Sequence, residues 1–445
     1  GREDIMTQKL DLKTKILMGV TLFSMFFGAG NLIFPPYLGA QAGTAAVPAF
    51  AGFALSAVGL PVLGVIAVTL SGGLNTLASR VHPKFAFVYI AALYLAIGPC
   101  LAIPRTASTS FSMAGPPFLP EGVPEPLVQL LYTVVFFVAA SLVAMHPEKL
   151  TEYLGKRLTP VLLILIAALF AAAVINPAGH PAPPAEAYAQ AAPVEGFLYG
   201  YQTMDTLAAL NFGMLVALNV REQGIREEKA VTKETVFAGW IAGVMLLVIY
   251  AMLAFTGYLS GTAFPGAVDG TEVLMQMAQF LFGKAGAVIL AVIFVIACFN
   301  TCVSLLSCCG KYFNSCFPKI SYRAWVFGFA AVSLLLANAG LEAILEFSVP
   351  VLNAIYPLAI LLIVLAFLHR AIERFPAVYP WAALFCGAGS VLTVLEQQGL
   401  MPSGVTELFQ MIPAYEAGFG WVVPTIFGAL IGVLWSVLLR KKSRQ

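Results

Sequence analysis

Long apolar runs follow one another along almost the whole chain, and short polar segments separate them. We count twelve runs that are long enough to cross a bilayer, because a membrane-spanning helix takes roughly 20 residues. They occupy residues 14–41, 46–72, 82–108, 126–145, 158–176, 196–219, 235–258, 284–309, 324–339, 348–369, 379–396 and 420–440. The pattern predicts an all-α integral membrane protein with about twelve transmembrane helices.

Composition supports this class of protein and narrows its partners. Hydrophobic residues make up 60% of the 445 residues and charged residues only 10%, a balance that is not typical of soluble domains. The net charge of +2 gives no basic footprint, so we expect the lipid bilayer and no nucleic acid as a partner. The four histidines lie in loops or at the ends of apolar runs, which argues against an enzyme because no nucleophile, base or metal site converges.

The basic residues test the number of spans. If the N-terminus is cytoplasmic, all of the 24 basic residues except Arg105 and Lys284 fall in segments on the inside. Cytoplasmic loops of membrane proteins carry this excess of Lys and Arg. One missed span would reverse every later loop, so the sequence predicts that both the N- and C-termini are cytoplasmic.

The first ten runs divide into two sets of five, which indicates an internal repeat. We expect a cytoplasmic N-terminus at 1–13, repeats at 14–176 and 196–369, two extra helices at 379–440 and a cytoplasmic tail at 441–445. Five spans per repeat give the two repeats opposite orientations, as in many transporters. Residues 1–5, which precede Met6, are interpreted as a remnant of an expression vector.

The first apolar run is interrupted halfway by the residues from Ser24 to Pro36. Gly28 and Gly30 weaken a helix and allow a ligand to approach the main chain. Pro35 and Pro36 suit the first turn of a second half-helix. A break here would expose N–H and C=O groups to a carboxylate and a cation; the alternative is a structural helix that glycine and proline only kink.

The sixth run is the least apolar, and Asp205 is the one acidic residue that we place well inside a span. An ionisable group at a helix centre costs at least about 2.5 kcal/mol, so a functional role is the first hypothesis. Its partner would be a substrate ammonium group, a coupling cation, a transferable proton, or the N–H groups of a helix that it caps. If the first helix is broken, an inverted repeat predicts that this one is broken too.

Two further polar features have open interpretations. Asn300, Thr301 and Ser304 offer side-chain oxygens that suit a small alkali cation, or their hydroxyls bond back to their own helix. Arg105 either gates an outer vestibule, pairs with an outer acid such as Glu195, or extends to the surface. The amphipathic run 271–282 is interpreted as a lid helix or a plain surface helix.

With these residues in view, the chain resembles the bacterial branched-chain amino acid:cation symporter family of the BrnQ type. The matching segments are Phe26–Pro36, Ile103–Ala107, Leu158–Pro160, Thr203–Ala208 and Ala297–Phe313. The resemblance implies sodium-driven uptake of leucine, isoleucine and valine through the bacterial cytoplasmic (inner) membrane by a multi-pass protein. It implies no cofactor apart from sodium as the coupling ion, and it does not specify an oligomeric state.

A more distant resemblance is to LeuT-type sodium symporters, whose first helix carries Gly-x-Gly-Asn-x-x-x-Phe-Pro at its break. Gly28 to Asn31 match this pattern, and Phe34-Pro35 follow one residue sooner. The resemblance implies a LeuT-like 5+5 inverted repeat with broken helices 1 and 6 plus two extra helices. It also implies that the N–H groups of Ala29 and Gly30 hold the substrate carboxylate, with Asn31 near a first sodium site or the substrate.

The same resemblance implies a second sodium site between helices 1 and 8. Its expected ligands are Ser24, Phe27, Ala297, Asn300 and Thr301. The LeuT-type family has two adjacent hydroxyl residues where this chain has Asn300-Thr301, which leaves the number and identity of the ions open. Asp205 has no counterpart there, so proton-coupled symport through Asp205 is the alternative mechanism.

We therefore expect alternating-access symport of a zwitterionic amino acid. Asp205 and open carbonyl groups of the sixth run would take the ammonium group. Thr203 lies in the same stretch, and Phe26, Met204 and Leu207 would line an aliphatic pocket. Hydrophobic contacts discriminate one methylene by only about 1–3 kcal/mol, so we expect leucine, isoleucine and valine to compete.

Overall fold

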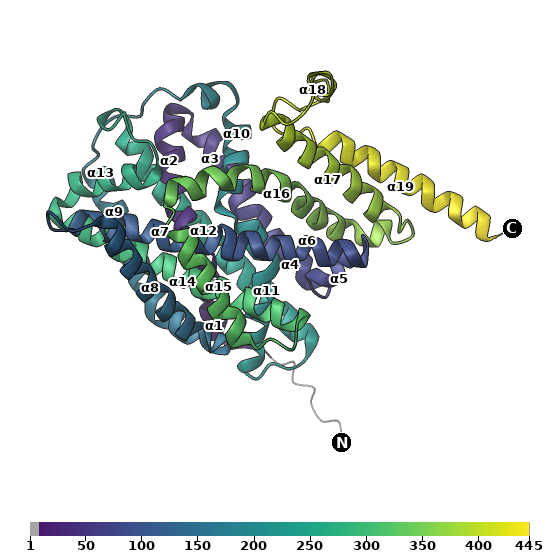
Figure 1. Ribbon diagram of the computed structural model, residues 1–445, viewed down its shortest axis with the longest axis horizontal. Helices are drawn as coiled ribbons and strands as arrows, with labels where there is room; N and C mark the ends of the chain where they lie inside the picture. Colours follow the sequence, from purple (N-terminus) through teal and green to yellow (C-terminus); the bar gives the residue numbers. More distant parts are fainter. Residues whose placement is uncertain (1–8, 445) are drawn as a thin grey trace. The chain divides into compact units, whose positions relative to one another are not determined.

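The computed structural model describes residues 9–444, and every regular element in that range is helical (Figure 1). The α-helices are α1 (Leu12–Phe26), α2 (Ala29–Ala42), α3 (Ala46–Ala54), α4 (Leu60–Leu70), α5 (Leu74–Ser79), α6 (Pro83–Leu95), α7 (Ala102–Ala114), α8 (Glu125–Ala144), α9 (Thr159–Ile175), α10 (Glu186–Gly200), α11 (Asp205–Glu222), α12 (Glu228–Ser260), α13 (Gly270–Phe282), α14 (Lys284–Cys316), α15 (Tyr322–Ala337), α16 (Leu341–Ile372), α17 (Val378–Gln397), α18 (Ser403–Gln410) and α19 (Val422–Ser443).

The all-helical membrane class is confirmed. Within residues 9–444, nine helical stretches are long and apolar enough to cross a membrane, or ten if the bent pair Glu186–Thr203 and Asp205–Glu222 forms one span. This number is smaller than twelve because α2 to α4 join into one stretch, Ala29–Leu70, and because α15 is shorter than 18 residues. The number of about twelve spans and the cytoplasmic termini stay predictions.

The chain forms two compact units. One comprises the chain up to Val65 together with Leu95–Glu346, and the other comprises Ile66–Tyr94 together with Phe347–Gln445. The predicted repeats at 14–176 and 196–369 are defined by the number and orientation of their spans and not by compactness. They stay a prediction. Residues 1–8 of the expected N-terminal segment and Gln445 of the expected tail lie outside the described residues.

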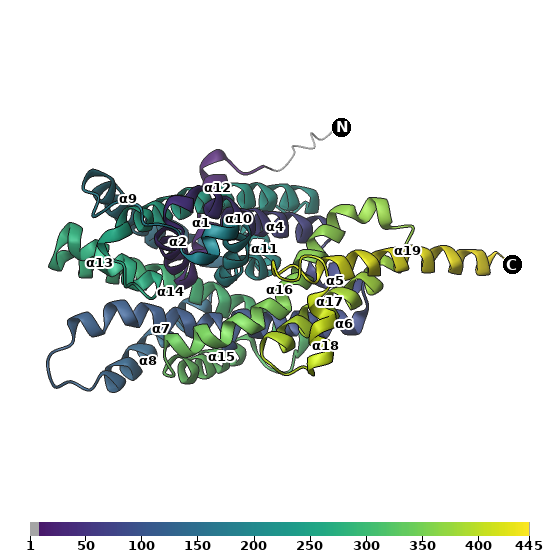
Figure 2. The same cartoon turned by 90° about the horizontal axis from the view of Figure 1, so that it is seen from above.

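In the first unit, α12 packs along both α1 and α2 (Figure 2). Glycine permits the close approach of α2 and α12. A Cβ on Gly39 would collide with the carbonyl oxygen of Ala254, and one on Gly257 would collide with that of Pro36. Small residues at such crossings let the backbones of membrane helices approach closely.

The beginning of α12 also carries a buried carboxylate that the sequence analysis placed outside the span 235–258. Glu234 is only 3% exposed. Its Oε1 atom lies 3.5 Å from the Nζ of Lys15 on α1, and the Lys15 ammonium lies 5.2 Å from the centre of the Phe237 ring. The ion pair joins α1 to α12 near one end of both helices.

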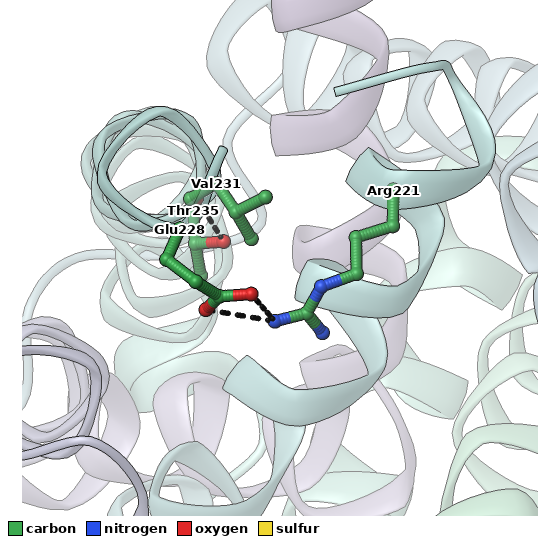
Figure 3. Close-up of polar contacts among 4 residues, drawn as sticks. All are labelled: Arg221, Glu228, Val231 and Thr235. Atoms are coloured by element: carbon green, nitrogen blue, oxygen red, sulfur yellow. Dashed lines mark hydrogen bonds and ion pairs between the residues drawn. The ribbon is translucent and has the colours of Figure 1, made fainter. Parts of the chain in front are cut away.

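A second ion pair joins the end of α11 to the start of α12 across a short turn (Figure 3). The Arg221 Nη2 atom lies 3.1 Å from Oε1 of Glu228. Both side chains are exposed, so this pair contributes at most about 1 kcal/mol. Thr235 donates from its hydroxyl to the carbonyl of Val231 at 2.8 Å, which satisfies a buried hydroxyl within its own helix.

The amphipathic run 271–282 forms α13, as its periodicity indicates. Asp269 caps the helix, since its side chain accepts a hydrogen bond from the backbone N–H of Glu272 at 2.9 Å. The apolar face of α13, which includes Val273 and Met277, is buried, and the helix packs on α14 and α2. Its role as a lid stays a prediction.

In the second unit, α17 packs against α19 through small residues. A Cβ on Gly428 would lie 2.6 Å from the carbonyl oxygen of Trp381, and Ser436 accepts a hydrogen bond from the backbone of Ala377 at 3.1 Å. On α6, the Tyr89 hydroxyl donates to the carbonyl of Ile355 on α16 at 2.9 Å. The candidate site lies entirely in the first unit.

Candidate functional site

The first helix is broken where the sequence predicted it. α1 ends at Phe26 and α2 begins at Ala29, with Phe27 extended (φ −79°, ψ 90°) and Gly28 in a non-helical conformation (φ −129°, ψ −144°). A Cβ on Gly28 would lie 2.5 Å from the hydroxyl oxygen of Thr301. Glycine at this position therefore lets α14 pack directly on the break.

The prediction that Pro35 and Pro36 start the second half-helix is wrong. α2 begins six residues before Pro35, so both prolines lie inside it. The physical reason is that the chain leaves the helix at Phe27 and Gly28 and returns to it at once. The prolines instead remove two backbone N–H donors from the interior of α2.

Asn31 connects this break to the second one. Its side-chain oxygen accepts a hydrogen bond from the N–H of Gly28 at 3.0 Å. Its side-chain nitrogen donates to both carboxylate oxygens of Asp205, at 3.0 Å and 2.9 Å. Two turns of irregular backbone far apart in the sequence are thus held together by one buried amide.

The second break lies in the sixth run, as the inverted repeat predicted. α10 ends at Gly200, a 3₁₀ turn covers Tyr201–Thr203, and α11 begins at Asp205 after a bend of 45°. Met204 occupies the left-handed region (φ 61°, ψ 11°), which costs energy for any residue other than glycine. Such strain persists where surrounding contacts fix the backbone, and it is frequent at functional sites.

Asp205 is buried (2% exposed) and is held by side chains of two other helices. Besides the two bonds from Asn31, its Oδ2 atom accepts a hydrogen bond from the Tyr250 hydroxyl on α12 at 2.5 Å. The residue before α11 is Met204, and the first N–H group of the helix, that of Asp205, donates to the Thr203 hydroxyl at 3.3 Å. The interpretation of Asp205 as a simple helix cap is therefore wrong.

Tyr250 is a site residue that the sequence analysis missed. It is fully buried and contacts both Asn31 and Asp205. The only signal in the sequence was a hydroxyl group in the middle of the apolar run 235–258. That signal is weak, because buried tyrosines are common and only the tertiary structure reveals their partner.

Arg105, on α7, is buried (4% exposed) and does not extend to the surface. Its Nη1 atom donates to the carbonyl oxygen of Gln202 at 2.7 Å, and Nη2 donates to that of Thr203 at 3.3 Å. The guanidinium also lies 5.6 Å from the centre of the Phe34 ring. It therefore satisfies carbonyl groups that the break in the sixth run leaves without helical partners.

A small cavity that opens to solvent lies between the two breaks. It is lined by Met25, Phe26, Ala29, Asn31, Ile97, Ala102, Arg105, Thr106, Thr203, Met204, Asp205, Ala208, Phe212, Thr301 and Leu305. Six of the seven expected substrate-binding residues are in this set, and the seventh, Gly30, lies against Arg105. A largely apolar wall with a few convergent polar groups is typical of small-molecule sites.

The expected sodium ligands lie where α1 meets α14. Thr301 donates from its hydroxyl to the carbonyl of Met25 at 3.1 Å, whereas Ser24 bonds back to Thr21 at 2.6 Å. Phe27 and Ala297 are fully buried. The side-chain nitrogen and oxygen of Asn300 are buried without a hydrogen-bond partner, and an unsatisfied buried polar group costs about 1–3 kcal/mol.

No group of three or more His, Cys, Asp or Glu side chains that would hold a transition metal occurs in the part of the chain that the structure describes. Oxygen atoms of α1 and α14 lie together where the sodium site is expected. Such hard, mostly neutral ligands suit an alkali ion. The geometry is compatible with the expected sodium site and leaves it a prediction.

Two broken helices that face one pocket in an all-helical membrane protein are typical of secondary transporters. The chain belongs to the family of branched-chain amino acid transport proteins, whose family model matches residues 11–439. It is a transporter and not an enzyme.

The relatives cover almost the whole chain. The branched-chain amino acid permease BraB of Bacillus subtilis is 38% identical over 98% of this chain and 98% of its own length. The branched-chain amino acid permease BrnQ of Escherichia coli (strain K12) is 35% identical over 97% of both chains. Identity at this level over full length establishes the family.

Solved structures support the fold alone. The nucleobase-cation-symport-1 family transporter Mhp1 matches with a TM-score of 0.63 at 14% identity, over 96% of this chain and 93% of its own. MhsT, solved in complex with L-phenylalanine, matches with a TM-score of 0.54 at 16% identity, over 98% and 99%. Both share the LeuT-like fold that the sequence predicted.

Proposed function

We propose that this chain is a secondary active transporter that carries leucine, isoleucine and valine into the cell by sodium-coupled symport, in the cytoplasmic membrane of a bacterium. The observation that carries the proposal is the cluster of Asn31, Asp205 and Tyr250, which joins the two helix breaks beside the cavity. The substrate class rests on the relatives, which are named as permeases for these amino acids.

The cavity offers a zwitterion both a carboxylate and a helix N-terminus. Asp205 binds the ammonium group, because it is the carboxylate that lines the cavity. The first N–H groups of α2, at Ala29 and Gly30, favour the substrate carboxylate, because a helix N-terminus carries free donors and a partial positive charge. Phe26, Met204 and Phe212 line the cavity beside these groups and receive the branched side chain.

Sodium binds between α1 and α14. The carbonyl groups of Ser24 and Phe27 and the side chains of Asn300 and Thr301 supply oxygen, with the Ala297 carbonyl as a further ligand. The unpartnered amide of Asn300 supports this assignment, because a bound ion would remove the cost of burying its oxygen. By bridging the two helices, sodium favours one state of the transporter and couples its gradient to uptake.

Proton coupling through Asp205 is the second candidate. Its support is that Asp205 receives hydrogen bonds from two neutral groups, the Tyr250 hydroxyl and the Asn31 amide, so that a proton can join the carboxylate without breaking an ion pair with either. Under this mechanism, Asp205→Asn would abolish uptake driven by a pH gradient. Under sodium symport it would weaken leucine binding at every pH, since the ammonium group loses its anionic partner.

The decisive experiment is leucine uptake into proteoliposomes at fixed pH, with an inward sodium gradient compared with an equal potassium gradient. Concentrative uptake that requires sodium supports the symporter. Uptake that ignores sodium and follows a pH gradient assigns the coupling to Asp205. If neither gradient drives uptake of leucine, isoleucine or valine, the assignment of the substrates is wrong.

A further inference from the structure

The cavity contains two side chains of opposite charge, and the proposed function uses only one of them. Asp205 and Arg105 both line it, and they are 2% and 4% exposed. They come from different helices, α11 and α7, and both line the same site. Burying a guanidinium is costly. An anionic group of a ligand in this cavity would lower that cost.

Arg105 lies against the start of α2 as well as the break at Met204. A Cβ on Gly30 would lie 2.6 Å from the Nη2 atom of Arg105. The guanidinium therefore lies beside the first turn of α2, where backbone N–H groups have no acceptor within the helix. A fixed cation and a helix N-terminus meet here, and both favour an anion.

We infer that Arg105 binds the carboxylate of the transported amino acid, together with the first N–H groups of α2, while Asp205 binds its ammonium group. This inference rests on the proposed function and adds a charged partner for the carboxylate to the backbone N–H groups of α2. An arginine fork matches a carboxylate in shape, whereas a lysine offers only a point charge. The substrate then lies with its carboxylate toward α7 and α2 and its ammonium group toward α11.

The competing explanation is purely structural. Arg105 holds the carbonyl groups of Gln202 and Thr203 at the break, and a variant that loses this contact will distort the whole cavity. Distortion weakens every ligand to a similar degree. Loss of a carboxylate partner weakens only ligands that carry a carboxylate, so the ratio between two matched ligands separates the explanations.

The experiment compares leucine with leucinamide, in which a neutral carboxamide replaces the carboxylate. Binding to the purified full chain is measured by the ligand-induced shift in Tm, with sodium present and at fixed pH, so that no transport activity is required. We expect the wild-type chain to prefer leucine by about 10- to 100-fold, which is the effect of a charge-assisted hydrogen bond. The preference should fall by about 10-fold in Arg105→Gln, in which only the N–H groups of α2 remain for the carboxylate, and should be intermediate in Arg105→Lys.

Ser108→Ala is the matched control on the same helix. The Ser108 hydroxyl donates to the carbonyl of Ala337 at 2.8 Å, away from the lining of the cavity. The Ser108→Ala variant should change the affinities for leucine and leucinamide by the same factor, so that their ratio stays as in the wild type. If Arg105→Gln also keeps the ratio while both affinities fall, Arg105 is a structural tie and the inference is wrong.

Isoleucine, valine and phenylalanine are tested beside their amides. If the wild-type chain binds a different amino acid from those proposed, and Arg105→Gln still lowers the preference for the carboxylate, the inference holds while the proposed substrates are wrong. If the wild-type chain binds none of these amino acids under sodium or at any pH, both are overturned.

Discussion

At the scale of single residues, the polar cluster between the two breaks works as a unit. Asn31 uses its oxygen on Gly28 and its nitrogen on Asp205, and Tyr250 donates to the same carboxylate. Each group satisfies another in an environment with little water, where an unpaired polar group is costly. The cluster thereby orients the Asp205 carboxylate before any substrate arrives.

Tyr250→Phe tests this orientation. The change removes one hydroxyl donor and keeps the ring that packs on Phe27 and Phe53. We expect the leucine affinity to fall by about 10- to 100-fold, as is usual when a hydrogen bond to a charged group is lost. Equilibrium binding of leucine to the purified wild-type chain and to the purified variant measures this change in affinity.

Tyr258→Phe is the control, since Tyr258 lies two turns farther along α12 and stacks on Phe255. Its affinity for leucine should equal that of the wild type. Unchanged leucine binding in Tyr250→Phe would show that the hydroxyl does not orient the carboxylate for the substrate.

The residues differ in how well the sequence reveals them. Asp205 and Asn31 stand out because charged and amide groups are rare in apolar runs. Arg105 was visible for the same reason, but its partners are backbone carbonyls of a distant segment, which leave no trace in the sequence. Tyr250 looks like any buried aromatic residue, so its role follows only from the approach of α12 to α11.

At the scale of elements, breaks and close packing determine where ligands can bind. Glycines at 28 and 30 gave the position of the first break correctly, because they weaken the helix at that point. The prolines do not mark the start of α2, since a proline inside a membrane helix is tolerated when its neighbours supply partners. The second break was predicted by symmetry, whereas the strained Met204 that forms it was not.

Thr301→Ala tests the junction of α1 and α14. The variant loses the hydroxyl that donates to the Met25 carbonyl and that lies beside Gly28. If this junction holds sodium, the sodium concentration for half-maximal uptake should rise about 10-fold or more, the usual effect of disturbing an ion's surroundings. The maximal rate at saturating sodium should change less, because the substrate site is retained.

Ser304→Ala is the matched control one turn farther along α14. Its hydroxyl bonds back to the carbonyl of Asn300 at 2.9 Å, so the sodium dependence should stay as in the wild type. An equal rise in both variants would indicate general disturbance of α14, and no rise in Thr301→Ala would argue against sodium at this junction.

Gly257→Ala tests the contact between α2 and α12. The added methyl group meets the carbonyl oxygen of Pro36, so the helices must separate, and such overpacking costs about 1–3 kcal/mol. The Tm of the purified chain should fall. Gly328→Ala is the control, because Gly328 lies at an exposed position of α15 and a Cβ there would meet nothing within 4 Å. Its Tm should equal that of the wild type or be slightly higher, because alanine favours a helix. Equal Tm values in the two variants would contradict the close contact between α2 and α12.

At the scale of the whole molecule, hydropathy predicted the class of fold well, because a bilayer permits few solutions for the backbone. The number of spans is harder to obtain, since α2 to α4 run on as one apolar stretch and α15 is short. The pairing of the two breaks depends on inverted symmetry, which no single segment of the sequence contains. Coupling between ion and substrate is a property of the whole chain and is likewise absent from any motif.

Coupling makes a reciprocal prediction that involves both sites at once. If sodium between α1 and α14 and leucine at Asp205 favour the same state, sodium must raise the leucine affinity by the factor by which leucine raises the sodium affinity. Typical coupling of this kind amounts to about 5- to 150-fold. Leucine binding to the purified chain, measured by calorimetry in sodium and in potassium at one pH, gives the first factor, and sodium titrations with and without leucine give the second. Equal leucine affinities in the two salts, combined with an affinity that changes with pH, would exclude sodium as the coupling ion and leave Asp205 as the group that carries the proton.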